Sequence, residues 1–208
     1  MNMKKATLFV IIGISYIFVT RLAATLFIEL FRNLSIARIN TVLSLLASIT
    51  LIFFYLYFYK EHVKESQIKL RYATILALMG SILGFIFFFK GFLILFHIIR
   101  PVNSNFVNVI IPWLSGLFSL YFFFIFHNEV DRKEYPQLKT ALLLAILGSV
   151  FAIIIRTFLV INYFTSDTFM WLWNLNIEYP FIAIPLSIVM FFCSVYFFVV
   201  LYKYECKD

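Results

Sequence analysis

Six long stretches of the chain consist almost entirely of apolar residues, and short polar stretches separate them. The apolar stretches cover residues 6–30, 40–59, 72–96, 107–127, 140–163 and 178–202. Because a helix needs about 20 consecutive apolar residues to cross the hydrocarbon core of a bilayer, each stretch is long enough to do so. The pattern therefore predicts an all-α, polytopic membrane protein with six transmembrane helices, built as a single transmembrane domain over residues 1–208.

The overall composition agrees with this assignment. Apolar residues make up 63% of the chain and its mean hydropathy is +0.98, whereas a soluble domain is usually about half apolar. The longest polar segment, near residues 60–71, is too short to form a domain of its own. A cleaved signal peptide is an alternative interpretation of the first stretch, but that stretch is longer than a signal peptide requires and Arg21 interrupts it.

Small and polar residues recur along the chain at a spacing of 68 residues. This spacing separates Asn40 from Asn108 and Asn108 from Asn176, and it also separates Pro112 from Pro180. The first helix joins the pattern with a small shift. We therefore expect three tandem, parallel copies of a two-helix hairpin, each copy about 68 residues after the last. The predicted copies are residues 4–60, 70–128 and 138–204.

Each odd helix of the predicted hairpins (the first, third and fifth) carries a glycine about a third of the way along. These glycines are Gly13, Gly80 and Gly148. Small residues let helix backbones approach closely in lipid, where packing rather than water exclusion drives association. The three glycines therefore predict close contacts between helices.

The formal charge of +7 arises mainly from four basic clusters that follow the hairpin pattern. The clusters are Lys4 and Lys5; Lys60, Lys64, Lys69 and Arg71; Arg132, Lys133 and Lys139; and Lys203 and Lys207. With six spans, all four lie on one side of the membrane, and the positive-inside rule assigns that side to the cytoplasm. We expect a multi-pass protein of the cell inner or plasma membrane with cytoplasmic N and C termini. This placement explains the basic charge without a nucleic-acid partner.

A basic residue lies late in each odd helix: Arg21, Lys90 and Arg156. At 1.5 Å per residue, each lies about 24–28 Å from the basic cluster at the start of its own helix, which places it in the outer leaflet. A charge at membrane depth is costly. We therefore expect the three cations to converge on an outward-facing pocket that binds a lipid phosphate, a carboxylate or a small anion, since arginine offers a bidentate fork to such groups.

Other polar residues of the outer half complete the predicted ligand-binding site. Glu29 shares a helix face with Arg21, and His97 shares one with Lys90. Glu178 lies at a similar depth. The remaining members are Asn40, Asn108 and Asn176, at the entrances of the even helices. Three structural alternatives stay open: the asparagines are helix N-caps, the cations snorkel to the headgroups, or they pair with the glutamates, as Arg156 would with Glu178.

The sequence offers no catalytic constellation and no metal or cofactor site. The H-E-x-x-H and G-x-S-x-G patterns are absent, and the two cysteines, Cys193 and Cys206, indicate neither a metal site nor a disulfide framework. The sequence thus favours a non-enzymatic membrane module that binds or senses an anionic lipid or small anionic ligand in an outer-leaflet pocket. A lipid-modifying enzyme is the weakest alternative.

Two further classes of function remain open: a small transporter or homo-oligomeric channel, and a structural subunit of a larger complex. A small transporter would need polar groups near the midplane, where this chain offers mainly serines such as Ser115, Ser149 and Ser187. A homo-oligomeric channel could have an apolar lining. A structural subunit of a larger membrane complex would also fit so small a chain. The expected partners are accordingly membrane lipids and either further copies of the chain or another membrane subunit.

Overall fold

The computed structural model describes residues 2–27, 34–98, 105–165 and 180–206, and within these residues it contains helices and no strand. The helices are α1 (Met3–Leu26), α3 (Leu34–His62), α4 (Ile68–Leu95), α5 (Asn105–Glu129), α6 (Pro136–Thr165) and α8 (Pro180–Tyr204). Each contains a segment that is long and apolar enough to cross a membrane. The prediction of an all-helical chain with six such helices is confirmed.

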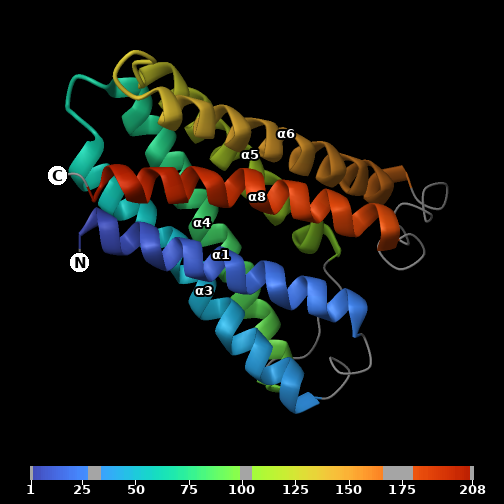
Figure 1. The fold of residues 1–208 in the computed structure, drawn as a ribbon. Helices are drawn as coiled ribbons and strands as arrows, with labels where there is room; N and C mark the ends of the chain where they lie inside the picture. The colour runs from blue at the N-terminus through green and yellow to red at the C-terminus, as the bar shows by residue number, and fades with distance from the viewer. Residues whose placement is uncertain (1, 28–33, 99–104, 166–179, 207–208) are drawn as a thin grey trace.

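The six helices pack as a ring in the order of the chain. Each helix contacts the next one in sequence, and α8 closes the ring by packing against α1. Both termini lie at the same end of the bundle, and several helices diverge toward the opposite end (Figure 1). The α1–α8 contact is therefore a seam between two helices that are not joined by a loop.

The odd helices α1, α4 and α6 bury matching faces near the end that holds the termini. The buried positions are Met3, Ala6, Thr7, Val10 and Gly13 in α1; Leu70, Ala73, Thr74, Ala77 and Gly80 in α4; and Leu138, Ala141, Leu142, Ala145 and Gly148 in α6. Steps of three or four residues place each set on one helix face. Most of these side chains are small, so the backbones of neighbouring helices can lie close together.

The three predicted glycines mark the closest of these contacts. A Cβ atom added to Gly13 would lie 3.1 Å from the carbonyl oxygen of Ala47, and one added to Gly80 would lie 3.3 Å from the Cα of Ser115. At Gly148 an added Cβ would lie 2.8 Å from the Cβ of Cys193. Each odd helix is thus pressed against the even helix that follows it, as the sequence predicted for these glycines.

Six aromatic residues of the even helices form the centre of the bundle, which we call the aromatic plug. They come in pairs: Phe54 and Tyr55 in α3, Phe122 and Phe123 in α5, and Phe197 and Phe198 in α8. The second ring of each pair meets the first ring of another pair edge to face. The centroids lie 5.1 Å apart for Tyr55–Phe122, 5.1 Å for Phe123–Phe197 and 5.0 Å for Phe198–Phe54. All six side chains are buried, so the plug fills the bundle at this level.

Carboxylates at the same end tie the helix ends together. Glu61 at the end of α3 accepts a hydrogen bond from the Met3 amide at 3.0 Å, where its charge also favours the N-terminus of α1. Glu129 at the end of α5 accepts one from the Gln67 side chain, at the start of α4, at 3.3 Å. Glu205 lies 2.7 Å from Nε2 of His62. These contacts hold both termini beside the end of α3 and join the end of α5 to the start of α4.

Large apolar side chains are exposed on every helix of the described chain. Examples are Ile12, Phe53, Met79, Phe124, Phe151 and Phe192, each between 44% and 62% exposed. Monomeric soluble proteins rarely expose apolar surface on this scale. The outer surface of the bundle is therefore of the kind that lipid or other apolar surroundings cover.

Replacing Phe122 by alanine should destabilise the bundle more than replacing Phe124. Phe122 contacts Tyr55, Phe58 and Phe126 and is fully buried, whereas Phe124 on the same helix is 52% exposed. Lipid tails are as apolar as phenylalanine, so mainly the packing contribution is lost, and we expect about 2 kcal/mol for Phe122→Ala. Reversible unfolding in detergent micelles measures both variants, and equal losses would contradict the central role of the plug.

Candidate functional site

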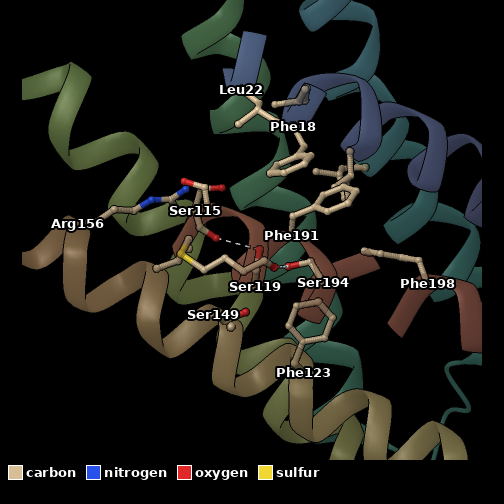
Figure 2. A pocket seen from close by; sticks show the side chains of 18 of the residues that line it. Phe18, Leu22, Ser115, Ser119, Phe123, Ser149, Arg156, Phe191, Ser194 and Phe198 are labelled. Atoms are coloured by element: carbon tan, nitrogen blue, oxygen red, sulfur yellow. Dashed lines mark hydrogen bonds between the residues drawn. The ribbon is translucent and has the colours of Figure 1, made fainter. Parts of the chain in front are cut away.

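A cavity of about 390 Å³ lies inside the bundle, next to the aromatic plug. Tyr55, Phe123 and Phe198, the second ring of each plug pair, line one end of it. From there it extends between α1, α3, α5, α6 and α8 to Leu22 and Arg156 (Figure 2). No described residue of α4 lines it. The cavity therefore occupies the half of the bundle that lies away from the termini.

The walls of the cavity are apolar with a few hydroxyl groups. Apolar lining residues include Ile14, Ile17, Phe18, Leu22, Leu51, Ile184, Met190 and Phe191, and the hydroxyls belong to Ser115, Ser119, Ser149, Ser187 and Ser194. Two of these serines donate to the backbone of their own helices, Ser119 to Ser115 and Ser194 to Met190, both at 3.0 Å. A serine oxygen that donates in this way keeps acceptor capacity toward the cavity. The lining thus suits an apolar molecule with a small polar group.

Arg156 of α6 is the charged residue among the described residues that line the cavity. Its Nη1 donates a hydrogen bond to the carbonyl oxygen of Pro112 in α5 at 2.6 Å. Gly116, one turn further along α5, leaves room for the guanidinium, because a Cβ there would lie 2.8 Å from Nη1. Beside this contact, Trp113 donates to the Thr157 hydroxyl at 3.0 Å. The carbonyl of Pro112 and the space beside Gly116 therefore fix the position of the guanidinium at the cavity wall.

Two stacked phenylalanines close the cavity wall at the seam between α1 and α8. The ring centroids of Phe18 and Phe191 lie 4.0 Å apart with an interplanar angle of 11°. Both residues line the cavity, and Figure 2 shows them on the side opposite Arg156. The cavity is thus bounded by an aromatic seam on one side and a cation on the other.

The structure brings only one of the three predicted cations to the described cavity lining. Arg156 lies eight residues after Gly148, whereas Lys90 lies ten residues after the matching Gly80. Two extra residues rotate a side chain by about 200° around its helix, and Lys90 is not among the lining residues. Arg21 belongs to α1, but its side chain lies outside the described part of the chain.

The predicted capping role of the asparagines is wrong for the first two. Helix α3 begins at Leu34 and α5 at Asn105, so Asn40 and Asn108 lie inside helices rather than before them. Helix α3 extends into residues 34–39, a segment that contains Ser35 and Arg38 and that the predicted apolar stretch did not include. Asn40 accepts a hydrogen bond from the Tyr16 hydroxyl at 3.0 Å, which joins α3 to α1.

His97 ends α4 instead of lining the cavity. It has a positive φ of 58°, its amide donates to the Ile94 carbonyl, and the Ile98 amide donates to the Leu93 carbonyl. These two bonds around a left-handed residue form a Schellman motif. The remaining predicted site residues, Glu29, Asn176 and Glu178, lie outside the described residues, as does the side chain of Asn108.

Sequence reasoning missed most of the residues that build the cavity. Hydropathy and charge do not point to Gly116, Phe18 or Phe191, and they suggest only a transport role for the serines. Ser115 and Ser119 are four residues apart in α5, so they share a helix face. That spacing, with Gly116 between them and Pro112 one turn earlier, was the signal available in the sequence.

Comparison with known proteins returned nothing: no family model matches the chain, and no curated protein or solved structure was found to be similar to it.

Replacing His97 by glycine should stabilise the end of α4, whereas replacing it by alanine should not. A left-handed conformation costs an L-residue about 1–2 kcal/mol relative to glycine, part of which glycine's greater backbone entropy offsets. We expect a net gain of about 0.5–1 kcal/mol for His97→Gly, measured by unfolding in detergent. A loss for His97→Gly as large as that for His97→Ala would show that the imidazole matters more than the cap.

Proposed function

We propose that the chain is an integral membrane protein whose six helices cross the bilayer with both termini in the cytoplasm, at the inner or plasma membrane. Exposed apolar side chains on all six helices support insertion. The basic clusters of Lys4, Lys60, Lys139 and Lys203 belong to helix ends on the side of the termini, which supports the orientation by the positive-inside rule.

A cysteine-labelling experiment tests this orientation. Cys206 is exposed near the C terminus, so in a Cys193→Ser background a membrane-impermeant maleimide should label it in inverted vesicles and not in intact cells. Ile98 is 61% exposed at the opposite end, so Ile98→Cys in a cysteine-free chain should give the reverse pattern. Labelling of Cys206 in intact cells would overturn the proposed topology.

We also propose that the chain consists of three copies of a two-helix hairpin arranged about a central axis. The three edge-to-face contacts of the plug support this, as do the matching buried faces of the odd helices. The positions that meet the three glycines are Ala47, Ser115 and Met190. Their spacings are 68 and then 75 residues, whereas Gly80 and Gly148 are 68 residues apart. The second helix of the third copy, α8, is therefore seven residues out of step with the uniform spacing of the asparagines. Seven residues are about two helical turns, which leaves the packing face unchanged.

The function best supported by the cavity is the binding of a small amphiphile with an acidic head group. The observation that carries this proposal is Arg156, held by Pro112 at the wall of a cavity that is otherwise apolar and hydroxyl-lined. The volume of about 390 Å³ lies within the usual range of ligand pockets. The tail would pack against the apolar walls, and the head would accept charge-assisted hydrogen bonds from Arg156.

Binding is favoured over passage through the bundle because the aromatic plug lies between the cavity and the end that holds the termini. Its six rings are buried in contact with one another. A transported molecule would have to separate them. A ligand that partitions into the bilayer could instead reach the cavity from the membrane, where the Phe18–Phe191 seam forms part of its wall.

Binding of radiolabelled decanoate to the purified protein in detergent, compared with decanol, tests the proposal. The two molecules share a tail and differ in the charge of the head. A hydrogen bond to a charged group contributes about 1.5–3 kcal/mol, so we expect Arg156→Gln to weaken decanoate binding at least about tenfold and to change decanol binding little. Gly116→Ala should cause a smaller loss, because it displaces the guanidinium without removing it.

Two matched variants control for general effects of charge and helix substitution. Lys90→Gln removes a cation that does not line the cavity, and Gly91→Ala adds a methyl group where nothing lies within 4 Å. Both should bind decanoate as the unaltered chain does. If Lys90→Gln weakens binding as much as Arg156→Gln, or if neither head group binds, the proposed site is wrong.

A further inference from the structure

A second concave site lies on the outside of the bundle, where α3 begins and α4 ends. This groove has a volume of about 410 Å³ and is lined by Ser35, Arg38, Ile39, Val42, Leu43 and Phe96. It shares no residue with the central cavity. Ile39 is 61% exposed and Leu43 41% exposed, so the groove faces outward from the bundle.

Arg38 is the cation of this groove, and Phe96 holds it in place. The guanidinium carbon of Arg38 lies 5.3 Å from the centroid of the Phe96 ring, within the range of a cation–π interaction. Phe96 itself caps α4 and donates its amide to the Phe92 carbonyl, directly before the Schellman motif at His97. The ring is thus fixed to the end of a helix, and it orients the guanidinium.

The Nε atom of Arg38 is buried and has no hydrogen-bond partner among the described residues. A buried N–H group without an acceptor is costly, and for a charged group the cost is larger. Because other atoms of the protein cover Nε, an incoming group cannot reach it. The two terminal guanidinium nitrogens are not among these buried atoms, and together they match two oxygens of a phosphate. An anionic group that accepts from them would therefore compensate the charge of Arg38 in the groove.

The position of Arg38 along α3 indicates which kind of molecule would supply the anionic group. The 22 residues from Arg38 to Lys60 within α3 span about 33 Å at 1.5 Å per residue, and the hydrocarbon core is about 30 Å thick. If the bundle crosses the membrane as proposed above, Arg38 lies at the level of the outer headgroups. Ile39, Val42 and Leu43 follow it toward the middle of the bilayer, where an acyl chain would lie.

We propose that this groove binds a glycerophospholipid of the outer leaflet. Arg38 holds the lipid phosphate, and one acyl chain lies against Ile39 and Leu43. The site is separate from the amphiphile site at Arg156 and depends only on the proposed membrane insertion. Bound in this way, the lipid would accept hydrogen bonds from the terminal nitrogens of Arg38 and would cover apolar surface at the α3–α4 hairpin.

Native mass spectrometry of the detergent-purified chain tests this site. After incubation with dioleoylphosphatidylglycerol, the unaltered chain should retain the lipid, and Arg38→Gln should reduce the retained fraction about tenfold. Arg38→Lys keeps the charge but not the fork, so it should recover part of the loss. Phe96→Leu keeps an apolar side chain but removes the ring, and should give an intermediate loss.

Three controls distinguish binding of the whole lipid from binding of its chains or of a phosphate alone, and from a general effect of charge. Dioleoylglycerol has the same chains without a phosphate and should not be retained, and inorganic phosphate in excess should not displace the lipid. Lys90→Gln should retain the lipid fully. Unchanged retention in Arg38→Gln, equal retention of dioleoylglycerol, or displacement by inorganic phosphate would each overturn the proposal. Decanoate binding in Arg38→Gln should stay normal, so a failure here is distinguishable from a failure of the Arg156 site.

Discussion

The edge-to-face contacts of the aromatic plug are the constraint on which the rest of the bundle depends. Each of the three even helices contributes one ring to a contact with each of the other two, so a tilt of any one helix would disturb two contacts. The odd helices then fit outside them through small residues, with close approaches at Gly13 and Gly148. Beyond the plug the helices spread apart (Figure 1), and the space that opens among them is the central cavity.

The number and type of the helices could be predicted from the sequence, but which face of each helix is buried could not. An apolar stretch of about 20 residues has the length of a membrane-spanning helix, so it is recognised from the sequence alone. In such a chain, however, the outward-facing and the core-facing sides of a helix are both apolar: Ile75 is exposed and Ala77 is buried, and hydropathy separates them poorly. The grouping of Lys90 with Arg156 in one ligand-binding site stays a prediction. In the structure Lys90 is not among the described residues that line the cavity, because it lies two residues further along its helix from the matching glycine.

The residues at which the helices begin could not be predicted from the hydropathy pattern either. Asn40 resembled a cap because apolar sequence begins there, yet α3 already begins at Leu34 and includes Arg38. In the bundle, a neighbouring helix contacts a charged residue in the second turn of α3 that a lone helix would leave in water. The two described arginines at this end are stabilised by different neighbours, Arg156 by the carbonyl of Pro112 and Arg38 by the ring of Phe96. Neither neighbour is near in sequence, so neither arrangement could be predicted from local pattern.

The contact between α1 and α8 brings the first and the last helix of the chain side by side. Lys4 lies 5.9 Å from the ring of Tyr202, so the beginning and the end of the polypeptide are adjacent. The ring of helices has no privileged starting point, and the present termini are one of several places where it could be opened. A circularly permuted gene, in which a short peptide joins the two described ends and a turn at the same end of the bundle supplies new ones, would encode the same contacts in a different order. The order of the helices along the chain is therefore separable from the contacts that they make.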